Sequence, residues 1–286
     1  MKDIIVGLGE ILWDILPEGK VLGGAPANFA YHTSQFGYDG YAVSAIGEDV
    51  LGKEIVSTLV EKEGLNYLIE TTDYPTGTVQ VTLDDAGVPQ YEICENVAWD
   101  NIPFTEKTRA LAQQTKAVSF GSLAQRNNVS KDSVRQFLQA MPTDSMKIFD
   151  INLRQHFYTK EIIDDSLQLS DILKINDDEI RIISKLFNIE EKEELDICKY
   201  LLDRYQLKLV ILTKGTDGSC ILTPNETSFL PTPKVQVADT VGAGDAFTAA
   251  FITSYLDGEP IAIAHQRAID FSAYVCTQHG AMPKKP

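Results

Sequence analysis

Residues 239–247 read Asp-Thr-Val-Gly-Ala-Gly-Asp-Ala-Phe, and this stretch decides more about the fold than any other in the chain. Gly242 and Gly244 can adopt backbone angles that other residues avoid, so consecutive amide groups can converge on one anion. The residues that follow predict a helix over 246–255, and a helix N-terminus adds unpaired N–H donors and the positive end of a dipole. The stretch therefore predicts a phosphate-binding turn that opens a helix.

Asp245 lies beside this turn, in the first turn of the expected helix. A carboxylate at that place repels phosphate, so its presence makes sense if it meets a proton-bearing nucleophile there. The combination indicates phosphoryl transfer to a hydroxyl group, with the carboxylate as the base. The alternative is structural: Asp239 or Thr240 caps the helix, and Asp245 only complements the helix dipole.

The composition of the 286-residue chain narrows its class. The chain has 41 acidic and 25 basic residues and a net charge of −16, which argues against nucleic acid or an anionic membrane as a partner. The four cysteines are far apart and lack a Cys-x-x-Cys spacing, so neither a zinc site nor a disulfide framework is indicated. The sequence has neither a signal peptide nor an apolar stretch of membrane-spanning length, so we expect a cytoplasmic protein.

Apolar, β-rich runs alternate with helix-period segments, which is the pattern of an α/β fold: a mostly parallel sheet covered by helices on both faces. No Pro/Ser-rich linker divides the chain, so we expect one main domain over residues 1–286. The predicted strands are residues 4–8, 117–120, 147–151, 172–175 and 207–212. The predicted helices are residues 25–36, 51–63, 131–140, 177–186, 191–205 and 246–255.

One segment breaks this rhythm and predicts a β-hairpin. Residues 77–83 alternate between polar and apolar, residues 84–87 form a turn, and residues 88–93 return. Together with residues 11–22 this hairpin can form a small lid sheet that excludes water from a site below it. We therefore expect lid elements at about 11–22 and 75–98; the alternative is a structural hairpin on the edge of the main sheet.

Two nucleotide-binding motifs are excluded by their spacing. Gly7 and Gly9 resemble the start of a dinucleotide fingerprint, but Leu12 stands where that pattern needs its third glycine. Residues 213–218 contain glycines and a lysine, but in an order that differs from that of a P-loop. A Rossmann dinucleotide site and Walker-type chemistry are therefore not supported.

Polar residues follow the first predicted strand, where open α/β sheets hold their ligands. Gly23 and Gly24 allow the backbone to approach a ligand closely, and Pro26 starts a helix that presents Asn28 in its first turn. Asp14 and Asn28 can each bond sugar hydroxyls. The alternative is that these residues only form caps and turns.

Three further strand ends carry polar clusters, at residues 150–154, 176–179 and 213–218. Arg154 offers a planar fork for an anion or sugar oxygens, and Glu179 suits hydrated Mg²⁺. Thr213 and the glycines after it let a nucleotide pass close to the backbone. Helix capping by Asn176 is the structural alternative.

Together these residues resemble the ribokinase-like carbohydrate kinases, the PfkB family. Residues 239–245 match the family motif Asp-Thr-x-Gly-Ala-Gly-Asp, and Gly23, Gly24 and Asn28 match its Gly-Gly-x-x-x-Asn motif. Residues 46–52 resemble the first family signature. The resemblance implies a three-layer α/β/α sandwich with a mostly parallel sheet and a small β lid.

The resemblance also implies a role for each matching position. Asp245 would be the base, and a monovalent cation such as K⁺ would lie near Asp239 and the Gly280 loop, where Val241 replaces the threonine common in ribokinases. Glu179 would organise Mg²⁺ through water. The anion hole would be Gly242, Ala243 and Gly244; the sugar would be held by Asp14, Gly23, Gly24, Asn28 and Arg154; and ATP would contact Asn176, Thr213, Gly215 and Gly218.

Within the family, residues 9–14 and 23–28 look most like bacterial fructokinases. This resemblance implies transfer of the ATP γ-phosphate to the 6-hydroxyl of fructose, with sugar and ATP as small-molecule partners. Many relatives also form homodimers through their lids. Two alternatives stay open: a kinase for another sugar, such as 2-keto-3-deoxygluconate or ribose, and a catalytically silent sugar-binding sensor.

Overall fold

The computed structural model describes residues 2–16, 19–62, 64–83, 89–190 and 193–286, which contain one large and one small sheet. The strands of the large sheet are β1 (Ile4–Leu8), β4 (Asp39–Gly47), β5 (Leu65–Thr72), β8 (Thr115–Phe120), β9 (Met146–Asp150), β10 (Ile172–Asn176), β11 (Leu209–Thr213), β12 (Ser219–Leu222) and β13 (Thr227–Leu230). Their order is β13-β12-β11-β10-β9-β8-β1-β4-β5. Neighbours pair in parallel from β11 to β5, whereas β12 and β13 are antiparallel.

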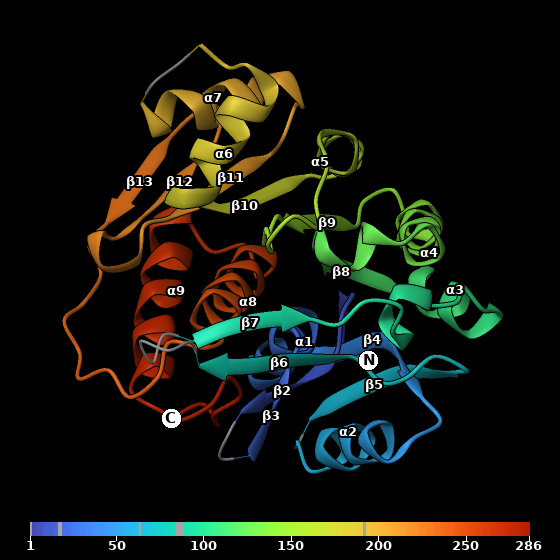
Figure 1. The fold of residues 1–286 in the computed structure, drawn as a ribbon. Coiled ribbons are helices and arrows are strands. Elements are labelled where there is room, and N and C mark those ends of the chain that lie inside the picture. Colours follow the sequence, from blue (N-terminus) through green and yellow to red (C-terminus); the bar gives the residue numbers. More distant parts are fainter. Residues whose placement is uncertain (1, 17–18, 63, 84–88, 191–192) are drawn as a thin grey trace.

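Helices cover both faces of this sheet because successive strand residues point to opposite sides. In β9, Phe149 packs in the apolar cluster of α3 to α7, whereas Ile148 packs in the cluster of α8 and α9. In Figure 1, α8 and α9 lie to the left of β8 and β9, and α3 and α4 lie to their right. The helices are α1 (Ala25–Gln35), α2 (Val50–Val60), α3 (Glu106–Ala112), α4 (Asn128–Ala140), α5 (Lys160–Gln168), α6 (Asp177–Phe187), α7 (Glu194–Arg204), α8 (Ala243–Leu256) and α9 (Ile261–Cys276).

The predicted strands and helices are confirmed, with their bounds shifted by up to three residues where both ends are described. The predicted positions 17–18, 63, 84–88 and 191–192 lie outside the described residues. Seven elements have no counterpart among the predicted strands and helices: β4, β5, β12, β13, α3, α5 and α9. None of the helices in the described ranges is long and apolar enough to cross a membrane.

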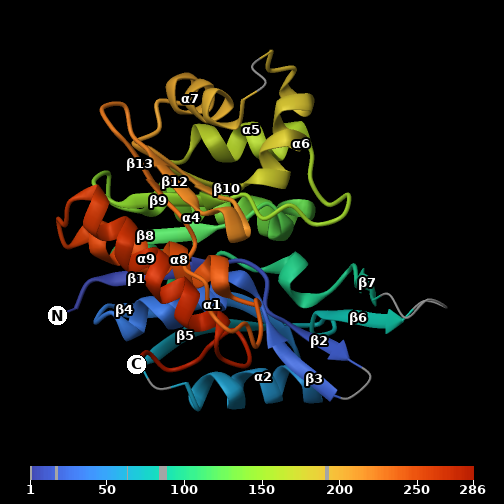
Figure 2. The same ribbon diagram turned by 90° about the vertical axis from the view of Figure 1, so that its left-hand side faces the viewer.

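A second sheet of β2 (Leu12–Leu16), β3 (Gly19–Gly23), β6 (Thr78–Leu83) and β7 (Pro89–Ile93) stands apart from the first, in the order β3-β2-β6-β7. The structure thus confirms that the two predicted segments form one small sheet, and the alternative of a hairpin on the edge of the main sheet is wrong. The small sheet projects from the body on the right of Figure 2. Strands β2 and β3 follow β1 in the sequence, and strands β6 and β7 follow β5.

A buried arginine joins the small sheet to the body. Arg126 follows β8 in a short 3-10 turn and donates through Nε to Asp100 Oδ1 at 2.7 Å and through Nη2 to Asp100 Oδ2 at 2.9 Å. Its Nη2 also donates to the carbonyl oxygen of Cys94, the residue after β7. The guanidinium lies 4.0 Å from the ring centre of Trp99 and 4.4 Å from that of Phe157. These contacts fix the base of the small sheet against the large one.

Candidate functional site

The phosphate-binding turn predicted at residues 239–245 opens α8, which begins three residues before the predicted helix. Gly242 is its N-cap with φ 79°, and a Cβ at that position would lie 2.7 Å from Cβ of Ala281, so only glycine fits. Asp239 accepts from Val241 N at 3.0 Å and from Gly280 N at 3.1 Å, which ties the turn to the C-terminal loop. Asp239 thus stabilises the turn but does not cap the helix, because the N-cap of α8 is Gly242 and no side chain caps it.

The first N–H groups of a helix have no acceptor within the regular helix, which is the reason why a helix start can bind an anion. The amide of Ala243 donates weakly to the carbonyl oxygen of Thr240 at 3.3 Å. The Gly244 amide follows it at the helix start, and the amide of Ala246 donates to Gly242 O at 2.9 Å. Asp245 lies in the same first turn of α8.

Asp245 contacts Asn28, although the two residues lie 217 positions apart in the sequence. Asn28 lies in the first turn of α1, after the N-cap Gly24 with φ 127°, and donates through Nδ2 to Asp245 Oδ2 at 2.8 Å. A Cβ on Gly24 would lie 2.5 Å from the carbonyl oxygen of Glu10, so this glycine lets α1 start against the end of β1. Burial, together with the charge of Asp150, raises the pKa of the Asp245 carboxyl to about 7. Asp245 is thus suited to gain and lose a proton near neutral pH.

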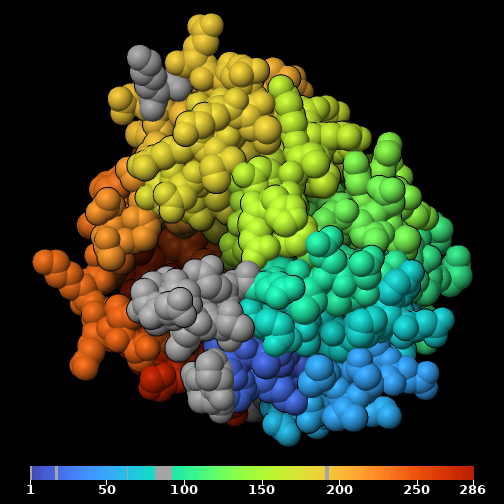
Figure 3. Space-filling view, viewed as in Figure 1, coloured from blue at the N-terminus to red at the C-terminus, as the bar shows by residue number. Residues whose placement is uncertain are grey.

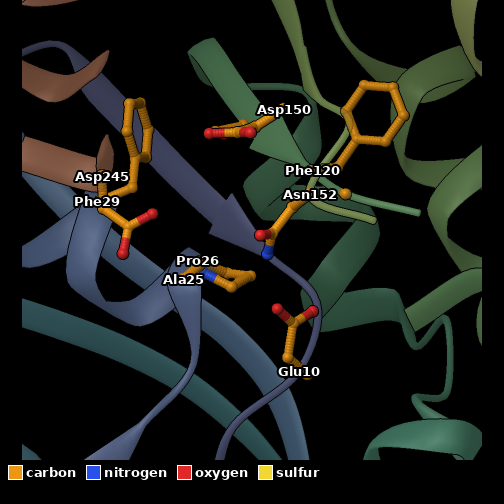
Figure 4. Close-up of a pocket in the computed structure, with 10 residues that line it drawn as sticks. Glu10, Ala25, Pro26, Phe29, Phe120, Asp150, Asn152 and Asp245 are labelled. Atoms are coloured by element: carbon orange, nitrogen blue, oxygen red, sulfur yellow. The ribbon is translucent and has the colours of Figure 1, made fainter. Parts of the chain in front are cut away.

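A small pocket, here called the carboxylate pocket, lies between Asp245, Glu10 and Asp150 (Figure 4). Its free volume is about 10 Å³, which is room for one water-sized group. Asn152 reaches into it from the segment after β9 and has the left-handed φ of 42° that is uncommon outside glycine. The pocket can therefore receive one hydroxyl group beside the carboxylate of Asp245.

The role of Glu10 in this pocket was missed by the sequence analysis. Glu10 is 4% exposed, and its Oε2 finds no hydrogen-bond partner among the described residues. Burial raises the pKa of its carboxyl to about 7, although its own backbone and Arg154 pull in the opposite direction. The available signal in the sequence was an acidic residue two positions after the end of the apolar strand β1.

Lys174 was also missed, although a lysine inside the apolar strand β10 is an unusual choice. Its Nζ lies 3.1 Å from Oδ1 of Asp150 on the neighbouring strand β9, and both side chains are 10% exposed. A Cβ built on Gly244 would lie 3.5 Å from the same Nζ. The ion pair therefore borders the turn that opens α8.

A much larger cavity of about 800 Å³ lies on the other side of that turn. Asn176, Thr213, Gly215 and Gly218 line it together with Gly244 and Lys174. Figure 3 shows the surface hollowed below the yellow residues of α6 and α7 and beside the orange residues that follow them, with dark red residues inside the hollow. The cavity, here called the large cavity, is roomy enough for a ligand of nucleotide size.

Asn176 and Glu179 form a capping box at the start of α6. Asn176 Oδ1 accepts from Glu179 N at 2.8 Å, and Glu179 Oε2 accepts from Asn176 N at 2.9 Å. The other oxygen of Glu179 accepts from Leu153 N at 2.9 Å. Burial raises the pKa of the Glu179 carboxyl, and Lys174 counteracts this effect. Asn176 therefore caps α6, as the structural alternative predicted. The capping box also holds the buried carboxylate of Glu179 near the large cavity.

The remaining predicted residues lie around the carboxylate pocket without lining it. Asp14 lies half-buried on β2, with its Oδ2 so close to Gly23 that a Cβ there would approach it to 2.7 Å. Arg154 is exposed and donates to its neighbour's carbonyl oxygen at 3.2 Å. Burial raises the pKa of the Asp14 carboxyl, and the charge of Arg154 opposes this rise.

Comparison with known proteins identifies the family. Residues 18–286 match the pfkB family of carbohydrate kinases. The chain belongs to this family. A sugar kinase of Pyrococcus horikoshii is 29% identical over 273 residues, which cover 88% of this chain and 83% of the relative. A fructokinase of Escherichia coli is 28% identical over 259 residues, which cover 86% of this chain and 82% of the relative.

Solved structures of family members share the fold. The crystal structure of the Pyrococcus horikoshii sugar kinase superimposes with a TM-score of 0.82 at 25% identity and covers 98% of this chain and 94% of its own. A fructokinase of Vibrio cholerae, solved with fructose, ADP and calcium ion, has a TM-score of 0.80 at 22% identity, with 99% and 95% of the two chains covered. The predicted ribokinase-like α/β fold is thereby confirmed, and the chain is a carbohydrate kinase by family and fold.

Proposed function

We propose that this carbohydrate kinase is a fructokinase, which transfers the γ-phosphoryl group of ATP to the 6-hydroxyl of fructose. The observation that carries the proposal is the position of Asp245, which belongs both to the turn at the start of α8 and to the carboxylate pocket. A base must reach the hydroxyl proton, and an anion-binding turn must reach the phosphoryl oxygens. Asp245 and the turn offer both functions within one helical turn.

Asp245 takes the proton of the 6-hydroxyl in this proposal. With a pKa of about 7, an appreciable fraction of Asp245 is ionised at neutral pH, and its hydrogen bond from Asn28 holds the carboxylate in place. The free volume of the carboxylate pocket suits one hydroxyl rather than a whole ring. The rest of the sugar then lies toward Asp14, Gly23, Gly24 and Arg154, under the small sheet.

The amides of Gly242, Ala243 and Gly244 bind the phosphoryl oxygens. The N-terminus of α8 contributes its dipole, which favours the negative charge there. Ala243 must release its weak 3.3 Å hydrogen bond to Thr240 for this purpose. Charge that develops on the phosphoryl group is thus stabilised by donors that are fixed before the reaction begins.

The large cavity takes ATP, with Asn176, Thr213, Gly215 and Gly218 along its wall. A Pyrococcus horikoshii relative has been solved in complex with ATP, which supports this donor. Glu179 fits a hydrated Mg²⁺ because an ionised carboxylate has about four lone-pair sites and the backbone occupies only part of them. When Mg²⁺ is bound, it neutralises part of the negative charge of the phosphates.

The small sheet acts as a lid, formed by the segments at about 11–22 and 75–98, that keeps water from the phosphoryl group. The lid and the body together form a single domain over residues 1–286. A monovalent cation such as K⁺ binds at Asp239, where the side chain bonds the Gly280 amide. A Vibrio cholerae fructokinase variant solved with fructose, ADP and potassium ion supports that cation.

The test measures ADP release from MgATP with fructose, ribose, glucose, mannose, 2-keto-3-deoxygluconate and nucleosides. We expect turnover selective for fructose and a loss of about 10²-fold to 10⁴-fold in Asp245→Asn. Asp132→Asn, an exposed aspartate of α4, is the matched control and should keep full turnover. Selective turnover of another sugar would correct the substrate, and wild-type turnover in Asp245→Asn would refute the assigned base.

A further inference from the structure

The ammonium group of Lys174 lies at the boundary between the two cavities. Lys174 and Ile172 point to the same side of β10, and Ile172 belongs to the apolar cluster of α8 and α9. The lysine therefore points toward the layer that α8 occupies, at the end of the sheet where α8 begins. Its side chain is 10% exposed, and Lys174 is one of the residues that line the large cavity.

Its partner Asp150 lines the other cavity. The Asp150 side chain borders the carboxylate pocket, and its Oδ1 lies 3.1 Å from Lys174 Nζ. The ion pair thus forms part of the wall between the proposed ATP site and the proposed hydroxyl site. Gly244 lies at the same wall, because a Cβ on it would lie 3.5 Å from Lys174 Nζ. A phosphoryl group that moves from one cavity to the other passes this ammonium group.

The charges around Lys174 make it the suitable cation for that place. Burial lowers the pKa of its ammonium group, but the carboxylates of Asp150, Glu179 and Asp245 together outweigh this effect and raise the pKa above its ordinary value. Lys234, the other cation that lines the large cavity, is exposed to solvent. A buried ammonium group exerts a stronger field on a phosphate than an exposed one, because less water screens it.

We propose that Lys174 is a further catalytic residue, which binds the phosphoryl oxygens during transfer, and that Asp150 positions its ammonium group. This inference rests on the proposed function. During transfer the sugar O6–phosphorus bond forms while the bond from phosphorus to the ADP oxygen breaks, and that bonding pair leaves with ADP. The hydroxyl proton goes to Asp245, and Lys174 keeps its own protons throughout.

A purely structural role would be that Lys174 only neutralises Asp150. Removing the lysine alone then harms the protein, because it leaves a buried carboxylate unpaired. Removing both charges would repair that damage if the role were structural. The double variant Lys174→Met/Asp150→Asn therefore distinguishes the two roles, and Lys174→Met alone serves as its reference.

The first experiment measures turnover of MgATP with the best sugar for the wild type, both variants and Lys116→Met. Lys116 is the matched control, because it also lies on a strand and pairs with a carboxylate, Asp144, but at the surface. We expect kcat to fall about 10²-fold to 10³-fold in Lys174→Met and to stay low in the double variant. Recovery of wild-type kcat in the double variant would overturn the inference.

The second experiment needs no turnover. Calorimetry compares the binding of ADP with that of a non-hydrolysable ATP analogue, both with Mg²⁺, to the wild type and to the double variant. We expect the double variant to lose about tenfold in affinity for the analogue relative to ADP. An unchanged preference would overturn the inference. If the wild type phosphorylates no sugar but the preference falls, the proposed function fails while the phosphate contact of Lys174 stands.

Discussion

Replacing Glu10 by glutamine should stabilise the folded protein at alkaline pH and leave its stability unchanged at acid pH. Burial raises the pKa of the Glu10 carboxyl from 4.5 to about 7. A carboxyl whose pKa is raised in the folded state stabilises that state while it is protonated, and this contribution is lost as the pH rises from 4.5 through about 7. Glutamine is never ionised, so the variant avoids the loss.

The size of the effect follows from the same two pKa values. Each pH unit between them is worth about 1.4 kcal/mol, so the rise from 4.5 to about 7 corresponds to roughly 3 kcal/mol. Solvent screens this carboxyl little, because Glu10 is only 4% exposed. The free energy of unfolding of Glu10→Gln should therefore exceed that of the wild type by roughly 3 kcal/mol above about pH 8. The difference should vanish below the ordinary pKa.

The assay is urea unfolding at a series of pH values, for the wild type, Glu10→Gln and Glu226→Gln. Glu226 lies in the exposed turn between β12 and β13, so its variant should follow the wild type at every pH. Glutamine also changes local hydrogen bonds, so the quantity to compare is how the stability difference changes with pH. A stability difference for Glu10→Gln that is equal at about pH 5 and about pH 8.5 would refute it.

Two further predictions use charges that are buried in the same region. The value of kcat/KM for the sugar should fall tenfold per pH unit below about pH 7, because Asp245 must be ionised to act. In Asp150→Asn this fall should move to lower pH, since the Asp150 charge raises the pKa of Asp245; a pH–rate profile that does not move would contradict the coupling. Arg126→Met should reduce the free energy of unfolding by about 3–5 kcal/mol in urea, because it leaves Asp100 buried and unpaired. Arg109→Met, which breaks an exposed pair, should cost less than about 1 kcal/mol, and equal losses in the two variants would contradict the assigned burial.

The parts of the site that the sequence could predict depend on short stretches of neighbouring residues. The glycines at 242 and 24 are required by positive φ and by close backbone approach, and such requirements can be read from a short stretch. Apolar strand runs likewise predicted most of the central sheet. The sequence places Asn28 and Asp245 in one expected site, but it does not predict the hydrogen bond between them.

The residues that the sequence analysis missed depend on tertiary arrangement. Lys174 and Asp150 become a pair only because their strands are neighbours in register and because both side chains point to the face that α8 covers. Glu10 is buried by α1 and by the segments after β8 and β9, which are distant in the chain. Strands β12 and β13 were missed because their antiparallel pairing on β11 departs from the alternating strand–helix rhythm.

The hydrogen bond between Asn28 and Asp245 joins positions that lie 217 residues apart. A ribosome that has made α1 and most of the large sheet still holds a chain without α8, and such a chain lacks the carboxylate we assign as base. We therefore expect partly synthesised molecules to transfer phosphate from ATP far more slowly than the complete chain. If Asp245 is the base, as we propose, the order of the chain delays full activity until α8 has been made.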